Sequence, residues 1–163
     1  MRVRRGRIGV NDRLQTLGIV LPPPPVPVAA FLPWVRSGNL VFLSGHIARR
    51  DGKPWVGQLG VSLGTEDGKA AARAVAIDLL GTLQAACGGD LGKVTRIVKL
   101  MVLVNSGPGF VEQHLVANGA SELIQDVLGP AGAHARSAFG VAQVPFGSCL
   151  EIELVAELCD AGG

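Results

Sequence analysis

Arg136 and Glu151 are the residues of this chain whose types and spacing suggest chemistry. They stand on two segments that flank a turn containing Pro145 and Gly147. An arginine is always cationic and its planar fork matches a carboxylate or a phosphate, while a glutamate can hold or activate a water molecule. The pair therefore predicts a small-molecule site in which an anion is clamped beside an acid that handles water.

Ordinary structural roles are the alternative for both residues. Apolar residues alternate with acids in the last apolar segment, so Glu151, Glu153 and Glu157 share one face of a predicted strand. That face could simply be solvated, and Arg136 could belong to a surface ion pair that contributes little to stability. The residue types alone do not decide between a site and a solvated surface.

The geometry of the turn adds a constraint. If residues 144–147 form a hairpin loop, Arg136 lies opposite Val155 and Glu151 lies opposite Gly140. At ~3.3 Å per residue, the two side chains would then be ~13 Å apart along the sheet. A compact site that uses both would have to be built between two chains.

Histidines and cysteines give no second site. The three histidines and the three cysteines have no spacing of a known ligand set, and no nucleotide-binding motif or nucleophile elbow is present. We therefore expect no metal and no cofactor.

The remaining sequence predicts an α+β domain, a mixed sheet with two helices packed on one face. Apolar residues recur at helical spacing in 66–86 and 110–128, and the first of these helices is expected to turn Thr82 away from its apolar stripe. Residues 94–104 are β-branched and apolar, which predicts a central strand. Trp34–Arg36 and Leu40–Ser44 read as a hairpin that ends in Gly45 and His46, and Trp55–Val56 as a short edge strand.

The N-terminal part is predicted to differ from this domain. Residues 1–27 comprise a basic arm, a short helix over Val10–Leu17 and a proline-rich stretch, Pro22–Pro27, which must be extended. We expect a stiff spacer that lies on the body of the protein. The domain itself is expected to span residues 28–160.

Composition narrows the class of protein. Apolar residues make up 48% of the 163 residues and charged residues 17%, and the mean hydropathy is +0.37. This low charge density predicts a homo-oligomer that buries apolar surface between subunits.

No apolar run is long enough for a membrane span, no export signal is visible, and unpaired cysteines fit a reducing compartment, so a cytoplasmic protein is expected. The net charge of +2 arises largely from the basic arm, and no nucleic-acid partner is expected.

Taken together, these residues resemble the RidA/YjgF superfamily, also called the L-PSP endoribonuclease or translation-initiation-inhibitor-like family, and in particular a longer, less characterised subgroup. The resemblance rests on Leu43-Ser44-Gly45, Ala135-Arg136-Ser137, Val144-Pro145 and Glu151-Ile152-Glu153, with the helix and strand that separate them. It implies a chorismate-mutase-like fold and a homotrimer with ligand clefts between subunits. It also implies hydrolytic deamination of reactive 2-enamine or 2-imino acids to 2-keto acids and ammonia.

The resemblance assigns roles to individual residues. Arg136 would bind the carboxylate of a small metabolite and Glu151 would position the attacking water. The other expected substrate-binding residues are Phe31, Ser44, Gly45, His46, Asn118, Ser137, Ala138 and Pro145.

Three of these positions depart from the deaminase pattern. Phe31 stands where deaminase members have a tyrosine, His46 replaces a glutamine and Ala138 replaces a cysteine. A non-catalytic carboxylate-binding trimer is therefore one alternative. A ribonuclease or translation inhibitor is the other, with only the basic arm as a footprint for RNA.

Overall fold

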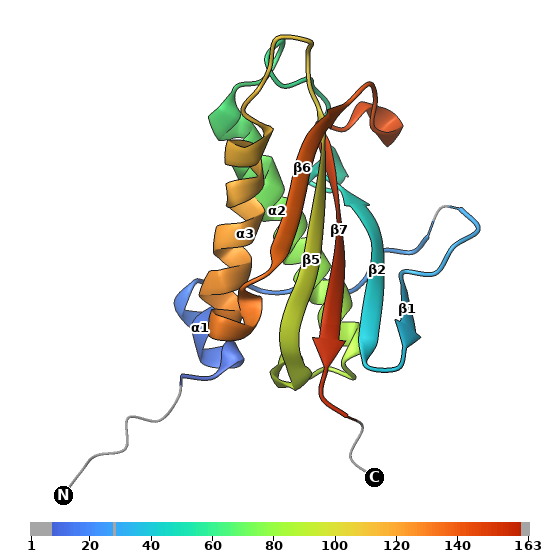
Figure 1. Cartoon of the computed structure of the whole chain (residues 1–163), viewed down its shortest axis with the longest axis vertical. Helices are drawn as coiled ribbons and strands as arrows, with labels where there is room; N and C mark the ends of the chain where they lie inside the picture. Colours follow the sequence, from blue (N-terminus) through green and yellow to red (C-terminus); the bar gives the residue numbers. More distant parts are fainter. Residues whose placement is uncertain (1–7, 28, 161–163) are drawn as a thin grey trace, which may run out of the picture.

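The computed structural model describes residues 8–27 and 29–160. Its elements are α1 (Val10–Thr16), β1 (Trp34–Ser37), β2 (Leu40–Ile47), β3 (Arg49–Arg50), β4 (Lys53–Pro54), α2 (Thr65–Ala86), β5 (Val94–Asn105), α3 (Gln113–Leu128), β6 (Ala135–Val141) and β7 (Leu150–Leu158). A five-stranded sheet in the order β1-β2-β7-β5-β6 carries α2 and α3 on one face (Figure 1). The predicted α+β class is therefore confirmed. The basic arm lies almost wholly outside the described residues.

The core forms between the sheet and the two long helices. Along β7, Leu150, Ile152 and Leu154 face the helices with exposed fractions of 0–1%, and the acids between them face the other way, as the alternation predicts. Gly64 caps the start of α2, and its backbone N–H donates to the Asp67 side chain at 2.9 Å. The buried stripe of α2 then runs the length of the helix on small and branched residues.

The predicted hairpin between β6 and β7 is wrong. Strand β6 pairs in parallel with β5, and β7 lies between β2 and β5, antiparallel to both. The physical reason is the connection through α3, because a strand, a helix and a second strand in sequence favour a parallel crossover. Across β5, Arg136 is level with Leu154 and not with Val155, while Glu151 pairs with Leu103 and lies far from Gly140.

Three local predictions also need correction. The edge strand predicted at Trp55–Val56 is not formed. The strands found just before it, β3 and β4, form a short hairpin, and Val56 makes only an isolated bridge to Ser148. Helix α3 starts at Gln113, after the Pro108-Gly109 loop, so Phe110 precedes it. Thr82 is buried with an exposed fraction of 0%, because it faces β2 and not solvent.

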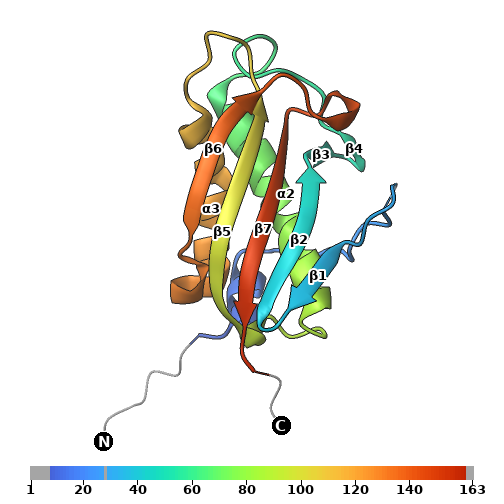
Figure 2. The same ribbon diagram turned by 45° about the vertical axis from the view of Figure 1, so that its right-hand side comes forward.

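The face of the sheet opposite the helices carries no helix, as Figure 2 shows from a second angle. Val35, Phe42 and Phe139 lie on this open face with exposed fractions of 53%, 45% and 42%. Met101, Leu103 and Val155 lie beside them, half-buried. This apolar face has no cover in the described part of the chain.

The N-terminal segment crosses the molecule on the helix side. Helix α1 lies beside α3, and the following residues run to the far edge of the sheet, where β1 begins (Figure 1). At the crossing, the Pro22 carbonyl oxygen would lie only 2.1 Å from a Cβ added to Gly81 of α2. A glycine at this point of α2 is what lets the segment lie so close. Of the helices in the described ranges, none has the length and apolarity to cross a membrane.

Candidate functional site

A cavity of about 620 Å³ lies at the edge of β2. Strand β1 pairs with β2 only as far as Leu43, so the edge of β2 from Ser44 to Ile47 is left to face the cavity. The proline-rich segment walls it from outside, α2 contributes Asp78, and β7 contributes Glu151. Of the residues predicted for the site, those that line this cavity are Phe31, Ser44, Gly45, His46, Pro145 and Glu151.

Glu151 and Gly45 lie against each other in the cavity. A Cβ added to Gly45 would lie 2.1 Å from Glu151 Oε1, so only a glycine lets this carboxyl group lie against β2. The register of β2 against β7 also shifts between Leu43 and His46, which re-aims the strand at this point. Burial raises the pKa of Glu151, and the neighbouring Glu153 raises it further. A carboxyl group with a raised pKa suits a water-activating base near neutral pH.

His46 is a structural group at the floor of the cavity. Its Nδ1–H donates to the Ser44 carbonyl at 2.8 Å, and its Nε2 accepts from the Thr82 hydroxyl at 2.8 Å. Both ring nitrogens are therefore occupied in the neutral imidazole. The pKa of His46 is lowered, mainly by burial. The hydrogen bond to Ser44 opposes this effect, and the charge of Arg49 adds to it. His46 fixes β2 to α2 and has no free nitrogen for a substrate.

The sequence did not reveal two charged residues of the cavity, Asp78 and Arg49. Burial raises the pKa of Asp78, and the nearby Arg49 opposes that effect. The available signal was an acid inside the apolar run Val75–Leu80 of a helix, where a solvent-facing residue is not expected. The proline-rich segment was also missed as a wall, since it was expected only to lie on the body.

Arg136 lies at the opposite edge of the sheet. Its Nη1 donates to Asn118 Oδ1 at 2.9 Å and to Ser121 Oγ at 3.1 Å, and its Nη2 donates to the His114 carbonyl at 3.1 Å. Every one of these acceptors is neutral, so the guanidinium is oriented without a counterion among the described residues. Ser137 and Ala138 adjoin it on β6, and Ser137 accepts a hydrogen bond from Lys99 at 2.9 Å.

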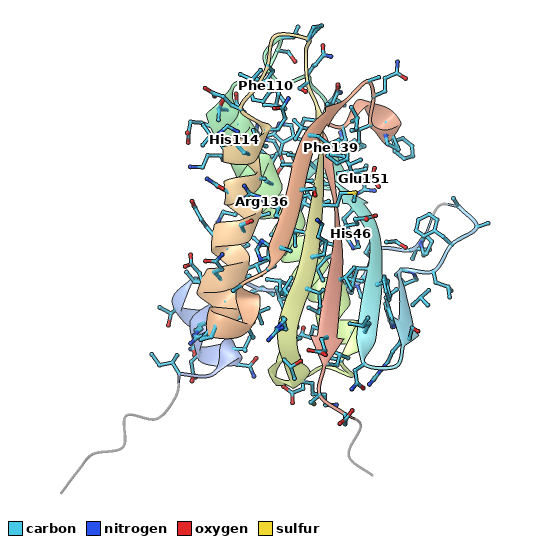
Figure 3. All side chains as sticks on the ribbon, viewed as in Figure 1. His46, Phe110, His114, Arg136, Phe139 and Glu151 are labelled. Carbon is cyan, nitrogen blue, oxygen red and sulfur yellow. The ribbon has the colours of Figure 1, made fainter. Side chains whose placement is uncertain are left out.

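Within one chain, the two groups of site residues do not meet. Strand β5 separates β6 from β7, and three residue positions along β5 separate the partners of Arg136 and Glu151. Strand spacing and rise then place their backbones about 14 Å apart. Figure 3 shows Arg136 beside α3, away from Glu151 and His46. The hairpin on which the sequence argument rested is wrong, but a wide separation also holds in the observed sheet.

The two edges have complementary chemistry. One presents a cavity with carboxyl groups and an apolar wall, and the other presents an oriented cation. Together they could bind the carboxylate of a ligand and activate a water molecule beside it. No three His, Cys, Asp or Glu side chains of the described residues cluster in a way that could hold a metal ion.

Comparisons with known proteins support a single family. A family model described as "YjgF/chorismate mutase-like, putative endoribonuclease" matches residues 11–158. Protein TCP17 of Trypanosoma cruzi is 48% identical over 158 residues, covering 96% of this chain and 97% of that protein. The crystal structure of Atu1372, a protein of unknown function from Agrobacterium tumefaciens, is 41% identical with a TM-score of 0.84, covering 92% and 94% of the two chains. A "putative endoribonuclease" from Shewanella oneidensis MR-1 is 28% identical with a TM-score of 0.88, covering 92% and 99%.

Proposed function

Since the chain belongs to the YjgF/chorismate mutase-like family, we propose that it is a hydrolytic deaminase of reactive 2-enamine and 2-imino acids. The site would be a cleft between subunits, where Glu151 of one subunit meets Arg136 of the next. The observation that carries the proposal is the distribution of charge. Among the described residues, the hydrogen-bond acceptors of Arg136 are all neutral, while burial raises the pKa of the Glu151 carboxyl group at the other edge.

The reaction follows from these two groups. Arg136 would hold the substrate carboxylate by paired hydrogen bonds, which fixes the imine carbon beside Glu151. Glu151 would take a proton from a water molecule as the water oxygen bonds to the imine carbon. That proton passes to the imine nitrogen and completes a neutral carbinolamine. Glu151 would then move the hydroxyl proton of the carbinolamine to its nitrogen as the C–N bond breaks and the C=O bond forms, so that ammonia leaves. The products are a 2-keto acid and ammonia.

The oligomer required by this site is proposed to be a homotrimer. The open face of the sheet, with Val35, Phe42 and Phe139 exposed, offers apolar surface of the kind that subunits bury. Light scattering coupled to size exclusion should give the mass of a trimer. Phe42→Asp should shift the mass towards the monomer and abolish deamination in parallel.

The activity is tested by trapping. An amino-acid oxidase generates the imino acid in the presence of semicarbazide, and added protein should lower semicarbazone formation. Arg136→Ala and Glu151→Gln should each lower kcat/KM by about 100-fold or more. Arg73→Ala, which removes an exposed arginine of α2, is the control and should retain full activity. Undiminished trapping with the wild-type protein would rule out the deaminase.

A non-catalytic carboxylate-binding protein is the second candidate. Phe31 lines the cavity where a phenol is expected, the chain has no tyrosine, and both nitrogens of His46 are engaged. Thermal shifts with 2-keto acids, without imine turnover, would favour this function.

The endoribonuclease named in the family description is the weaker candidate. Two acids and one arginine line the cavity, and the rest of its lining is largely apolar, so it lacks the excess of positive charge that a phosphate chain requires. RNA cleavage that copurifies with the protein and is lost in both Arg136→Ala and Glu151→Gln would reverse this ranking.

A further inference from the structure

The cavity at the edge of β2 is larger and more apolar than a three-carbon imino acid needs. Its volume is about 620 Å³, within the range of about 300–1,000 Å³ typical of pockets that enclose drug-sized ligands. Six prolines line it, namely Pro22, Pro23, Pro25, Pro27, Pro33 and Pro145, and Phe31 and Phe146 add two aromatic rings. A three-carbon ligand would leave most of this apolar surface in contact with water.

Several polar side chains of the cavity are already engaged. The Ser44 hydroxyl donates to the Leu32 carbonyl at 2.6 Å, and both nitrogens of His46 are hydrogen-bonded. The prolines have no backbone N–H to offer. The charged groups that remain, Glu151, Asp78 and Arg49, come from β7, α2 and β3. The cavity therefore combines three charged groups with a largely apolar lining.

Phe146 adds an aromatic surface at the lining of the cavity. Its backbone is left-handed, with φ +59°, a conformation that is rare for an aromatic residue and is expected to be strained. The side chain is 65% exposed, so packing in the protomer core does not account for it. Strained residues cluster where a ligand is held, and here the ring lines the same cavity as the proline-rich wall.

We propose that the cavity selects 2-imino acids with bulky apolar side chains, aromatic or branched, and that the proline-rich segment and Phe146 form the pocket for that side chain. This inference rests on the proposed deaminase function and adds its substrate class. The reacting carbon lies beside Glu151, and the side chain lies against the prolines. The family match over residues 11–158 includes this segment.

Gly81 keeps the wall in place without lining the cavity. The Pro22 carbonyl lies against α2 at Gly81, and an added Cβ would be 2.1 Å from its oxygen. Gly81→Ala must therefore displace the segment from α2, while every residue of the cavity keeps its identity. The control is Gly109→Ala, because a Cβ at Gly109 would meet nothing within 4 Å.

The experiment compares imino acids formed in place from alanine, leucine and phenylalanine, with semicarbazide as the trap. We expect kcat/KM for the phenylalanine-derived imine to exceed that of the alanine-derived imine by about 10- to 100-fold. Gly81→Ala should lower this ratio by about tenfold, whereas Gly109→Ala should preserve it. Phe146→Asn, which suits the left-handed backbone, tests the same ratio if Gly81→Ala does not fold.

The outcomes separate this inference from the proposed function. Equal or faster turnover of the alanine-derived imine overturns the substrate class and leaves the deaminase intact. If no imine is turned over, the deaminase fails, and calorimetric titration of the wild-type protein with pyruvate and phenylpyruvate decides the ligand class. Phenylpyruvate binding at least about tenfold tighter than pyruvate supports a bulky apolar ligand, and equal binding overturns it.

Discussion

A histidine ring is held in the same way at each edge of the sheet. At the β2 edge, His46 donates from Nδ1 to the Ser44 carbonyl and accepts from Thr82 of α2. At the β6 edge, His134 donates from Nδ1 to the Gly132 carbonyl at 2.6 Å, and its Nε2 pairs with Ser121 of α3 at 2.9 Å. In both cases a helix hydroxyl and a carbonyl two residues earlier hold the ring.

The two edges differ in the charged side chains that lie beside these histidines. Ser121 also accepts from Arg136, so the β6 edge presents an oriented cation. Thr82 and His46 support a cavity that presents the carboxyl groups of Glu151 and Asp78 together with Arg49. Arg136 and Glu151 therefore lie at different edges of one chain. In the proposed cleft between subunits each edge would supply one half of the site, and we call the two edges half-sites.

The largest expected effect is the recovery of activity when two inactive variants, one in each half-site, are mixed. Arg136→Ala and Glu151→Gln are each expected to be inactive, but a hybrid trimer contains clefts that combine an intact Glu151 with an intact Arg136. Random mixing with cyclic symmetry should restore about one quarter of the wild-type sites. Chains refolded together from denaturant should regain this activity, and each variant refolded alone should not. Hybrid trimers that form and stay inactive would mean that each site lies within one chain.

Gly45→Ala should disturb only the acidic half-site. The new methyl group would occupy the position of the Glu151 carboxyl group, and a displacement of about 1 Å in a reacting group can cost about 100-fold in rate. We expect kcat/KM to fall by about 10- to 100-fold with the fold retained by circular dichroism. Gly109→Ala is the matched control. An equal loss of kcat/KM in Gly109→Ala would show that the effect does not come from the contact between Gly45 and Glu151.

Thr82→Val should separate support from chemistry. The variant keeps the shape of the side chain but leaves Nε2 of the buried His46 without its donor. The free energy of unfolding in urea should fall by about 1–3 kcal/mol. The value of kcat/KM should change less than about threefold, because the ring nitrogens of His46 are hydrogen-bonded within the protein and are expected to play no part in the reaction. Thr16→Val on exposed α1 should stay within about 0.5 kcal/mol of wild type. A large loss of rate without a loss of stability would make His46 a participant in the reaction.

Glu153→Gln should give the smallest effect, a shift in the pH profile. The pKa of Glu151 is raised first by burial and then by Glu153, so removal of the second charge should lower the pKa. As a base, Glu151 acts when deprotonated, and the rising acid limb of kcat/KM should therefore move to lower pH. Glu122→Gln, which changes an exposed acid of α3, should leave the acid limb of kcat/KM unchanged. A shift to higher pH would show that Glu151 is not the base.

Periodic segments made much of the fold predictable. The alternation in Leu150–Leu158 correctly placed the acids on one face of β7, and the spacing of apolar residues predicted α2 almost to the residue. These patterns work because burial on one face requires a period of two in a strand and 3.6 in a helix.

Strand pairing and the cavity were harder to predict from the sequence. The Pro145-Gly147 turn indicated a hairpin, but the order β5, α3, β6 favoured the parallel pairing that the structure has. Asp78 and Thr82 were missed because a helix that packs against both a sheet and a crossing segment has no wide solvent-facing side there. A local pattern carries no information on such long-range contacts.

The contact between Pro22 and Gly81 also bears on the thermodynamics of ligand binding. A run of prolines has little conformational freedom to lose, whether in the unfolded chain or on the helix, and the contact with α2 fixes its position before a ligand arrives. A side chain that enters the cavity therefore meets a wall that is already ordered, and association carries only a small entropic penalty from the protein. Calorimetry should then show a negative heat-capacity change from apolar burial, without the large unfavourable entropy that accompanies the folding of a loop around its ligand.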